Sequence, residues 1–408
     1  MFEQEASLKA PARPAKGSVL EVLLVFLRLG LSSFGGPIAH LGYFREEFVT
    51  RRKWLDEQAF ADLVALCQFL PGPASSQTGF SIGLMRAGYL GGLAAWTAFT
   101  LPSAIALLLF AYGAGKLGGP LGSGLLHGLK LVAVAIVAQA VWGMARSLCP
   151  DRERASIATV AAVIVLFSAS SAGQIAAILI GAIAGLWLCR DAPPPATGYI
   201  AMPVSRGAGF VFLAVFAILL AAALLLSGRT SLAGFDVFAA FYRSGALVFG
   251  GGHVVLPLLR QAFVAPGWVS DDAFLAGYGA AQAVPGPVFT FAAYLGAVLK
   301  TEPNGLAGAA IGLFGIFLPG LLILMGMLPF WDAFRMRLGA QAVMRGVNAS
   351  VVGLLGAALY NPIWTTSVKG PLDVALALIG FVLLVAWRAP SFVVVLIGAL
   401  GGVVLALL

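Results

Sequence analysis

The sequence Gln68-Phe69-Leu70-Pro71-Gly72-Pro73 returns in the second half of the chain as Gln282-Ala283-Val284-Pro285-Gly286-Pro287. In both places the Pro-Gly-Pro element interrupts an apolar stretch, and proline inside a helix removes a backbone hydrogen bond and breaks the helix. Proline is well suited to the first turn of a helix, so Pro73 and Pro287 are predicted to begin new half-helices. The fold should therefore contain helices that break at two equivalent positions.

These two elements belong to a longer internal repeat. Phe34-Gly35-Gly36 lies upstream of the first Pro-Gly-Pro, and Phe249-Gly250-Gly251 lies upstream of the second. Further residues match in the same order: Glu21 with Asp236, Phe26 with Phe241, Arg28 with Arg243, and Trp54 with Trp268. So many ordered matches predict that one ancestral unit has been duplicated.

The repeat and the apolar pattern divide the chain into five segments. We expect a cytoplasmic N-terminal tail at 1–17, a first repeat at 18–190, a linker at 191–206, a linking transmembrane helix at 207–227 and a second repeat at 228–408. The tail has no apolar core followed by a cleavage site, so no cleaved signal peptide is expected there.

The composition excludes a water-soluble protein. The 408 residues are 60% hydrophobic and 10% charged, with a mean hydropathy of +0.96, whereas soluble domains are about 25% charged. Residues 155–189 and 389–408 contain no charged side chain, and roughly 20 apolar residues cross a bilayer as a helix. The chain is therefore predicted to be an all-α polytopic membrane protein.

The net charge of +8 does not indicate nucleic-acid binding, because most lysines and arginines lie in short loops between apolar stretches, as the positive-inside rule requires. Residues 45–53 hold four of them, whereas the equivalent residues 260–269 hold one. Equivalent loops are therefore expected on opposite faces of the membrane. Inverted-topology repeats with broken or re-entrant helices around a central site are typical of secondary transporters.

The broken segments are the expected binding site. Helix breaks at membrane depth are tolerated where they are buried in protein or line a water-filled cavity, and a free helix N-terminus binds oxyanions. The predicted substrate-binding residues are those of the breaks and the polar residues beside them: Arg28, Gly35, Gly36, Gln68, Pro71, Gly72, Pro73, Ser75 and Ser76 in the first half, and Arg243, Gly250, Gly251, Gln282, Pro285, Gly286, Pro287 and Thr290 in the second.

Arg28 and Arg243 suit an oxyanion because the donors of a guanidinium form a fixed fork. Each follows an acidic residue, Glu21 or Asp236, by two helical turns, which places acid and base about 10.5 Å apart on one helix face. The structural alternative is that Pro and Gly only kink packed helices. Each arginine would then snorkel to the interface or pair with another helix.

Further polar residues are candidates for coupling or for lining the cavity: Glu21, Asp236, His40, His253, Lys130 and Asp62. His40 and His253 follow the glycine breaks at non-equivalent positions, and Lys130 lies inside an apolar segment. The sequence has no metal-ligand spacing, nucleotide-binding loop or His-Glu-x-x-His motif. We therefore expect no metal, no cofactor and no enzymatic activity.

The ordered motifs resemble those of the chromate ion transporter family, from about residue 18 to residue 408. The resemblance is carried by Phe34-Gly35-Gly36-Pro37, Arg51-Arg52-Lys53-Trp54-Leu55, Phe249-Gly250-Gly251-Gly252-His253 and the two Pro-Gly-Pro segments. It implies a two-domain, long-chain bacterial protein that exports chromate across the inner membrane and gives resistance, with sulfate as the related oxyanion. An anion channel and, less favoured, a membrane-embedded enzyme are the alternatives. The oligomeric state stays open, with a homodimer among the options.

Overall fold

The computed structural model describes residues 17–114, 119–168, 171–190, 203–230, 234–249, 252–331, 333 and 337–407. This described part is helical and contains no strand. Five helices are long and apolar enough to cross a bilayer: Ala74–Gly113, Leu121–Leu148, Arg206–Leu225, Gly305–Phe330 and Leu338–Ser367. The prediction of an all-α polytopic membrane protein is confirmed.

The first half contains, in order, α1 (Val19–Ser32), α2 (Gly36–Arg45), the π-helix η1 (Glu46–Arg51), α3 (Glu57–Phe69), α4 (Ala74–Ala114), α5 (Gly119–Leu148), α6 (Arg152–Phe167) and α7 (Ser171–Leu188). α8 (Arg206–Leu225) then occupies the segment expected to link the halves. The predicted tail at 1–16, most of the predicted linker and the candidate residues Gly250 and Gly251 lie outside the described residues.

The second half follows the same order. It contains α9 (Phe235–Ala246), η2 (Gly252–Val254), α10 (Val255–Leu259), the π-helix η3 (Arg260–Val264), α11 (Asp271–Ala281), η4 (Val288–Thr290), α12 (Phe291–Ala297), α13 (Gly305–Met327), η5 (Leu328–Phe330), α15 (Leu338–Ala358), η6 (Leu359–Trp364), α16 (Thr365–Ser367), α17 (Pro371–Val385) and α18 (Ser391–Leu407). Each half therefore has a π-helix between its two broken stretches.

Local sequence explains how the first broken stretch forms. Ser18 caps α1 by accepting a hydrogen bond from the Glu21 N–H at 3.0 Å. The chain then turns at Gly35 and Gly36, whose φ angles of 101° and 77° lie in the left-handed region that favours glycine. Pro37 follows at the start of α2. The chain therefore changes direction at the break instead of continuing as one helix.

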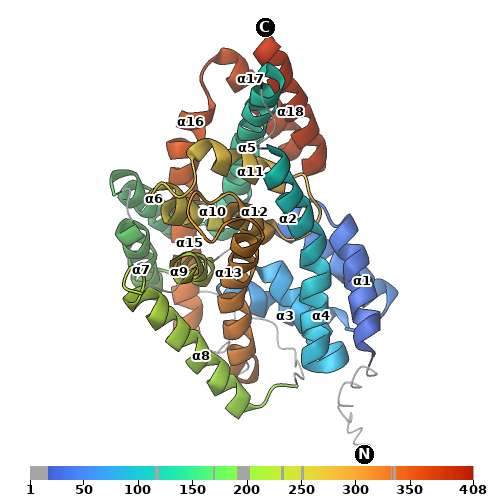
Figure 1. The fold of residues 1–408 in the computed structure, drawn as a ribbon. Helices are drawn as coiled ribbons and strands as arrows, with labels where there is room; N and C mark the ends of the chain where they lie inside the picture. The colour runs from blue at the N-terminus through green and yellow to red at the C-terminus, as the bar shows by residue number, and fades with distance from the viewer. Residues whose placement is uncertain are drawn as a thin grey trace, which may run out of the picture.

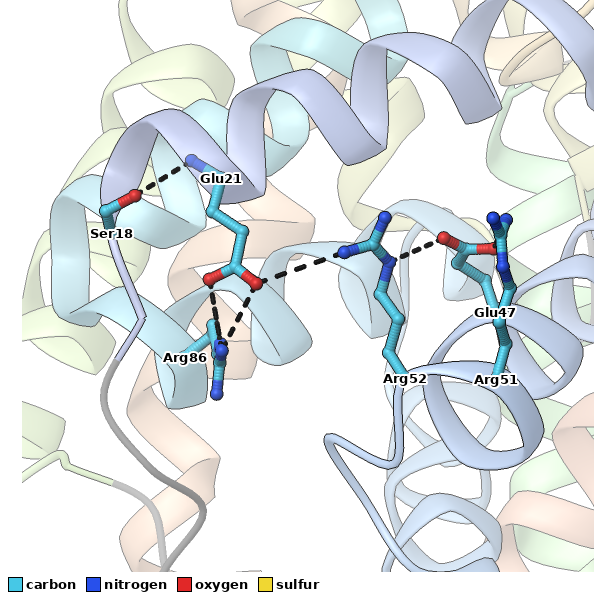
Figure 2. Close-up of polar contacts among 6 residues, drawn as sticks. All are labelled: Ser18, Glu21, Glu47, Arg51, Arg52 and Arg86. Atoms are coloured by element: carbon cyan, nitrogen blue, oxygen red, sulfur yellow. Dashed lines mark hydrogen bonds and ion pairs between the residues drawn. The ribbon is translucent and has the colours of Figure 1, made fainter.

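An ion-pair network joins the outer ends of these half-helices (Figure 2). Arg86, at the end of the first part of α4, pairs with Glu21 in the first turn of α1 at 3.1 Å, and Arg52 lies 3.9 Å from the same carboxylate. Arg52 and Arg51 both bind Glu47, at 2.6 and 3.0 Å. The start of α1 therefore lies beside the segment that follows α2 and the end of the first part of α4, so both broken stretches of the first half begin and end in the same region.

The charge state of this network follows from its geometry. Glu47 is buried, and burial by itself raises the pKa of its carboxyl group. The hydrogen bonds from Arg52 and Arg51 outweigh burial, and the pKa of Glu47 lies below its usual value. Glu47 therefore remains ionised.

A second ion pair recurs in both halves. Arg45 pairs with Glu57 at 2.6 Å and fixes the end of α2 near the start of α3. The equivalent residues Arg260 and Asp271 pair at 2.9 Å and fix η3 near the start of α11. The second half therefore repeats the contact that the first half makes between these two segments.

α4 is a hairpin and not one straight rod. Ala87 and Gly88 leave the helical conformation, and the two parts of the helix approach so closely at Gly83 and Gly91 that a Cβ on either glycine would overlap the other's carbonyl group. Gly296 of α12 and Gly308 of α13 make the equivalent contact in the second half. Small residues allow membrane helices to approach at this distance.

The two halves exchange their last helices. α5 of the first half packs against α17 and α18 of the second, whereas α15 of the second half packs against α6 and α7 of the first (Figure 1). Glycine makes both contacts close, since Gly128 of α5 meets the backbone at Gly398 of α18, and Gly346 of α15 meets the backbone at Gly181 of α7. Neither half is a separate globular unit.

The equivalent helices α4 and α13 run in opposite directions where they meet. Tyr112, near the end of α4, has its hydroxyl beside Gly305 at the start of α13. Trp96, earlier in α4, packs against Phe314 and Phe317, further along α13, with ring centroids 6.0 and 5.6 Å apart. Antiparallel equivalent helices are what inverted repeats require.

Labelling from the two sides of the membrane tests the inversion. In a variant that lacks Cys67, Cys149 and Cys189, single cysteines at the equivalent, exposed positions Thr50 and Ala265 should react with an impermeant maleimide from opposite faces. The cysteine-free parent provides the background. Labelling of both positions from the same face would refute inverted topology.

Candidate functional site

The two halves interlock at their breaks through a reciprocal pair of backbone hydrogen bonds. The Gly72 N–H of the first Pro-Gly-Pro donates to the Val248 carbonyl at 2.7 Å, and the Gly286 N–H of the second donates to the Ser33 carbonyl at 2.9 Å. Val248 and Ser33 each stand just before a glycine break. Each Pro-Gly-Pro turn therefore docks on the glycine break of the other half, and we call this region the crossing.

The crossing requires glycine at the centre of each turn. Gly72 has a φ of 120° and Gly286 a φ of 97°. A Cβ on Gly72 would lie 2.9 Å from the Cα of Gly320 in α13, and one on Gly286 would lie 2.9 Å from the hydroxyl of Ser103 in α4. Ser103 and Gly320 follow Pro102 and Pro319 in the equivalent helices. The crossing is therefore held between α4 and α13 with no space for a side chain.

Two histidines lie at the crossing. The Nε2 of His40 lies 3.2 Å from the Ser33 carbonyl and Nδ1 lies 3.4 Å from the Ser75 hydroxyl, so Nε2 carries the proton and Nδ1 accepts. His253 places Nδ1 2.6 Å from the Tyr278 hydroxyl. Its Nε2 lies toward Gly36 of the other half. The breaks of the two halves are therefore neighbours in space.

The crossing contains buried polar groups with no hydrogen-bond partner among the described residues. They include three donors, the hydroxyls of Ser33 and Ser76 and the Nε2 of Gln282, and one acceptor, the Oε1 of Gln77. Ser75 and Ser76 lie in the first turn of α4, which begins directly after Pro73. Buried polar groups in proteins are normally paired. These donors and the free N–H groups at the start of α4 are the arrangement expected for an anion.

The second half-helix differs from the prediction. Pro287 is followed by the 3-10 turn η4, and α12 begins only at Phe291. The Thr290 hydroxyl donates to the Pro287 carbonyl at 2.6 Å, which satisfies that hydroxyl locally. Only the first Pro-Gly-Pro therefore leads directly into an α-helix.

The first Pro-Gly-Pro turn is fixed by Gln77, a neighbouring amide donor in the sequence that lies outside the predicted substrate-binding set. Gln77 donates its side-chain amide to the Pro71 carbonyl at 3.0 Å and to the Gly320 carbonyl at 2.8 Å. The aligned residue in the second half is Phe291, so this clamp exists on one side only. The predicted pair Gln68 and Gln282 is also unequal, since Gln68 is exposed and Gln282 is buried.

The structure does not bring the two arginines to the crossing. Arg28 is exposed, because α1 buries Val22, Phe26 and Leu29, and Arg28 projects from the other side of the helix. Arg243 is half-buried, and its Nε donates to the Ala239 carbonyl of its own helix at 3.3 Å. Within the described residues, no hydrogen bond or ion pair joins either guanidinium to the crossing.

The acidic candidates are also held elsewhere. Glu21 belongs to the network with Arg86, and Asp236 accepts hydrogen bonds from the Ser227 hydroxyl at 3.1 Å and the Gly228 N–H at 2.7 Å. Asp62 is buried in α3. As the two-turn spacing suggested, neither Glu21 nor Asp236 is paired with the arginine on its own helix.

A second cluster of polar residues lines a cavity of about 860 Å³ between α5, α11, α12, α17 and α18. Lys130, predicted as a cavity residue, lies here with its Nζ 2.8 Å from Asp272. His127 places its Nε2 2.8 Å from Asp373. Sequence reasoning did not select His127, Asp272 or Asp373. The sequence does contain a signal for this cluster, since His127 precedes Lys130 by one turn in an apolar helix. Ionisable residues inside membrane helices are rare and functional.

Together these features define a duplicated, polytopic α-helical membrane protein whose halves interlock at broken helices, the architecture of a transporter more than of an enzyme. The family model described as chromate transporter matches the chain twice, over residues 20–186 and 235–403. The chain belongs to the chromate transporter family.

Relatives with curated names match over nearly the whole chain. A chromate transport protein of Pseudomonas aeruginosa is 29% identical over 96% of this chain and 92% of its own length. A chromate transport protein of Cupriavidus metallidurans is 25% identical over 93% and 91%, and a probable chromate transport protein of Synechococcus elongatus is 25% identical over 95% of each chain. No solved structure matches this chain.

Glycine substitutions test the crossing. Gly72→Ala and Gly286→Ala should each destabilise the protein by at least about 1–2 kcal/mol, because alanine is strained in the left-handed region and its Cβ meets a neighbouring helix. Thermal unfolding of the detergent-purified protein measures the change. Gly113→Ala is the matched control, since open space surrounds that helical glycine. Unchanged unfolding midpoints for the two crossing variants would contradict the packing described here.

Proposed function

We propose that the protein is a secondary transporter that exports chromate, or the similar oxyanion sulfate, across the bacterial inner membrane. The observation that carries the proposal is the match of both halves to the chromate transporter family. The named relatives from Pseudomonas aeruginosa and Cupriavidus metallidurans, which cover more than nine-tenths of this chain, support chromate as the substrate. The chain lies in the membrane with its N-terminus in the cytoplasm.

The crossing is the proposed point of alternating access. Its two hydrogen bonds, from Gly72 to Val248 and from Gly286 to Ser33, join the halves where the broken helices meet. The start of α4 presents free N–H groups, and the Ser76 hydroxyl and Gln282 amide lie buried beside the breaks without partners in the described residues. An oxyanion held there would face one side of the membrane or the other as the halves rock.

Chromate and sulfate are dianions of similar shape, so hydrogen bonds to their oxygens do not select one over the other. Selection between them would have to come from size or from competition in the cell. Competition by sulfate for chromate transport is therefore part of the proposal, and the drive for export is an ion gradient or exchange, because the sequence contains no nucleotide-binding loop.

Everted inner-membrane vesicles test transport directly. In vesicles that contain the protein, radiolabelled chromate should accumulate above its external concentration when a proton gradient or a counter-anion gradient is imposed without ATP. Excess sulfate should reduce the rate. Vesicles from cells without the gene provide the background.

Each of the other possible outcomes would point to a different function or direction of transport. Accumulation that stops at the external concentration under every gradient would identify an anion channel. Accumulation that requires ATP after the gradients have been collapsed would exclude a secondary transporter, and accumulation only in right-side-out vesicles would reverse the direction of transport.

A further inference from the structure

A dianion inside the membrane needs positive charge close to it. A helix N-terminus supplies only about half a charge, and α4 is the helix that begins directly at a Pro-Gly-Pro. Arg28 is exposed and Arg243 is bonded to its own helix. Among the described residues, Lys130 is the only lysine or arginine that is buried, with 6% of its surface exposed. Lys130 is therefore the buried cation that could pair with such a dianion.

Lys130 lies at the wall of the 860 Å³ cavity, and its only described ionic partner is Asp272 at 2.8 Å. The two partners differ in their surroundings, since 8% of the Lys130 side chain is exposed but 78% of the Asp272 side chain is. An ammonium group so placed is costly to leave unpaired. A carboxylate that is already mostly exposed can turn away from the ammonium at small cost.

The second acid of the cavity is held differently. Asp373 accepts hydrogen bonds from His127 Nε2 and from the Lys369 N–H, both at 2.8 Å, and only 10% of its side chain is exposed. Asp373 is therefore held in place by two hydrogen bonds. Asp272 is the exchangeable acid, and the side chain of Lys369 adds a further positive charge to the same cavity.

We propose that this cavity binds a tetrahedral oxyanion such as sulfate or chromate, which pairs with Lys130 by displacing Asp272. An incoming dianion replaces one carboxylate at the ammonium, so Lys130 is never left buried without a partner. The transport role of the site rests on the proposed function. Oxyanion binding at the site does not.

The position of the cavity relates it to the crossing. Asp272 is in the first turn of α11, and Gln282 follows the last turn of the same helix, just before the second Pro-Gly-Pro. Their separation of ten positions along the helix corresponds to about 15 Å. α5 is packed against this helix, since a Cβ on Gly279 would meet the carbonyl group of Leu129, the neighbour of Lys130. The cavity is therefore one helix length from the crossing.

The pair joins the two halves, since Lys130 lies in α5 of the first and Asp272 in α11 of the second, and the repeat-related positions have no equivalent charge pair. The residues aligned with Lys130 and Asp272 are Asn348 and Gln58, which are neutral. The site therefore exists at one end of the molecule only. Because the halves differ at this position, an oxyanion would be held more tightly on one side of the crossing than on the other. The entry and the exit of a path through the crossing would then differ in affinity.

Binding of radiolabelled sulfate and chromate to the purified full-length protein tests the site. Lys130→Met should weaken binding by at least about tenfold, because a hydrogen bond between charged groups is lost, whereas Lys130→Arg keeps the charge and should retain most of the affinity. Asp272→Asn should tighten binding by about fivefold, the effect of removing a competing, largely exposed carboxylate. Lys130→Met combined with Asp272→Asn should show no tightening.

Matched controls come from the neighbouring carboxylate of the same helix and from an exposed lysine elsewhere. Asp271→Asn removes the neighbouring carboxylate from the same turn of α11, but Asp271 pairs with Arg260 and does not line the cavity, so the affinity should not change. Lys300→Met removes an exposed lysine and should also leave binding unchanged. A purely structural ion pair predicts instead that Asp272→Asn behaves like Asp271→Asn or weakens binding, and this result would overturn the proposal.

The outcomes separate the two proposals. If the parent protein transports chromate but Lys130→Met and Asp272→Asn bind and transport as the parent does, the cavity site is wrong and the transport function stands. If Asp272→Asn tightens binding through Lys130 but the parent vesicles accumulate no chromate, the site stands and the transport function fails. Should Lys130→Met not fold, the comparison of Asp272→Asn with Asp271→Asn still decides.

Discussion

The need to satisfy broken backbone inside a membrane controls this structure. Lipid offers no hydrogen-bond partner, so a helix that stops at membrane depth leaves donors and acceptors that only protein or trapped water can satisfy. Here the two halves supply each other: the turn at Gly72 donates to Val248, and the turn at Gly286 donates to Ser33. The breaks are stable because each Pro-Gly-Pro turn faces the glycine break of the other half. A single half would leave both sets of groups unpaired.

Glycine makes this solution sterically feasible. Contacts between backbone and backbone occur inside the α4 hairpin at Gly83 and Gly91, at its equivalent between Gly296 and Gly308, and between the exchanged helices at Gly128 and Gly346. Such contacts provide van der Waals packing where no hydrophobic driving force acts between helices in lipid. Glycine therefore both breaks helices at the crossing and allows the surrounding helices to pack closely.

Sequence patterns predicted the duplication, the positions of the breaks and the membrane class, because proline, glycine and charge act locally along the chain. They did not predict which side of a helix faces the protein: Arg28 matches Arg243 in the repeat, but its helix turns it outward and away from the breaks. They also missed the His127–Asp373 and Lys130–Asp272 pairs, each of which joins residues distant in sequence. Pairings of this kind depend on the exchange of helices between halves, which no local signal records.

That exchange has a consequence for how the chain is made. The helix pair α6 and α7 leaves the ribosome long before α15, its main packing partner, and synthesis from Leu188 to Leu338 takes on the order of ten seconds. During this interval the first half has inserted into the lipid but cannot complete its tertiary contacts. Until the second half has been made, α6 and α7 therefore lack their main packing partner, and the breaks of the first half lack the groups that pair with them.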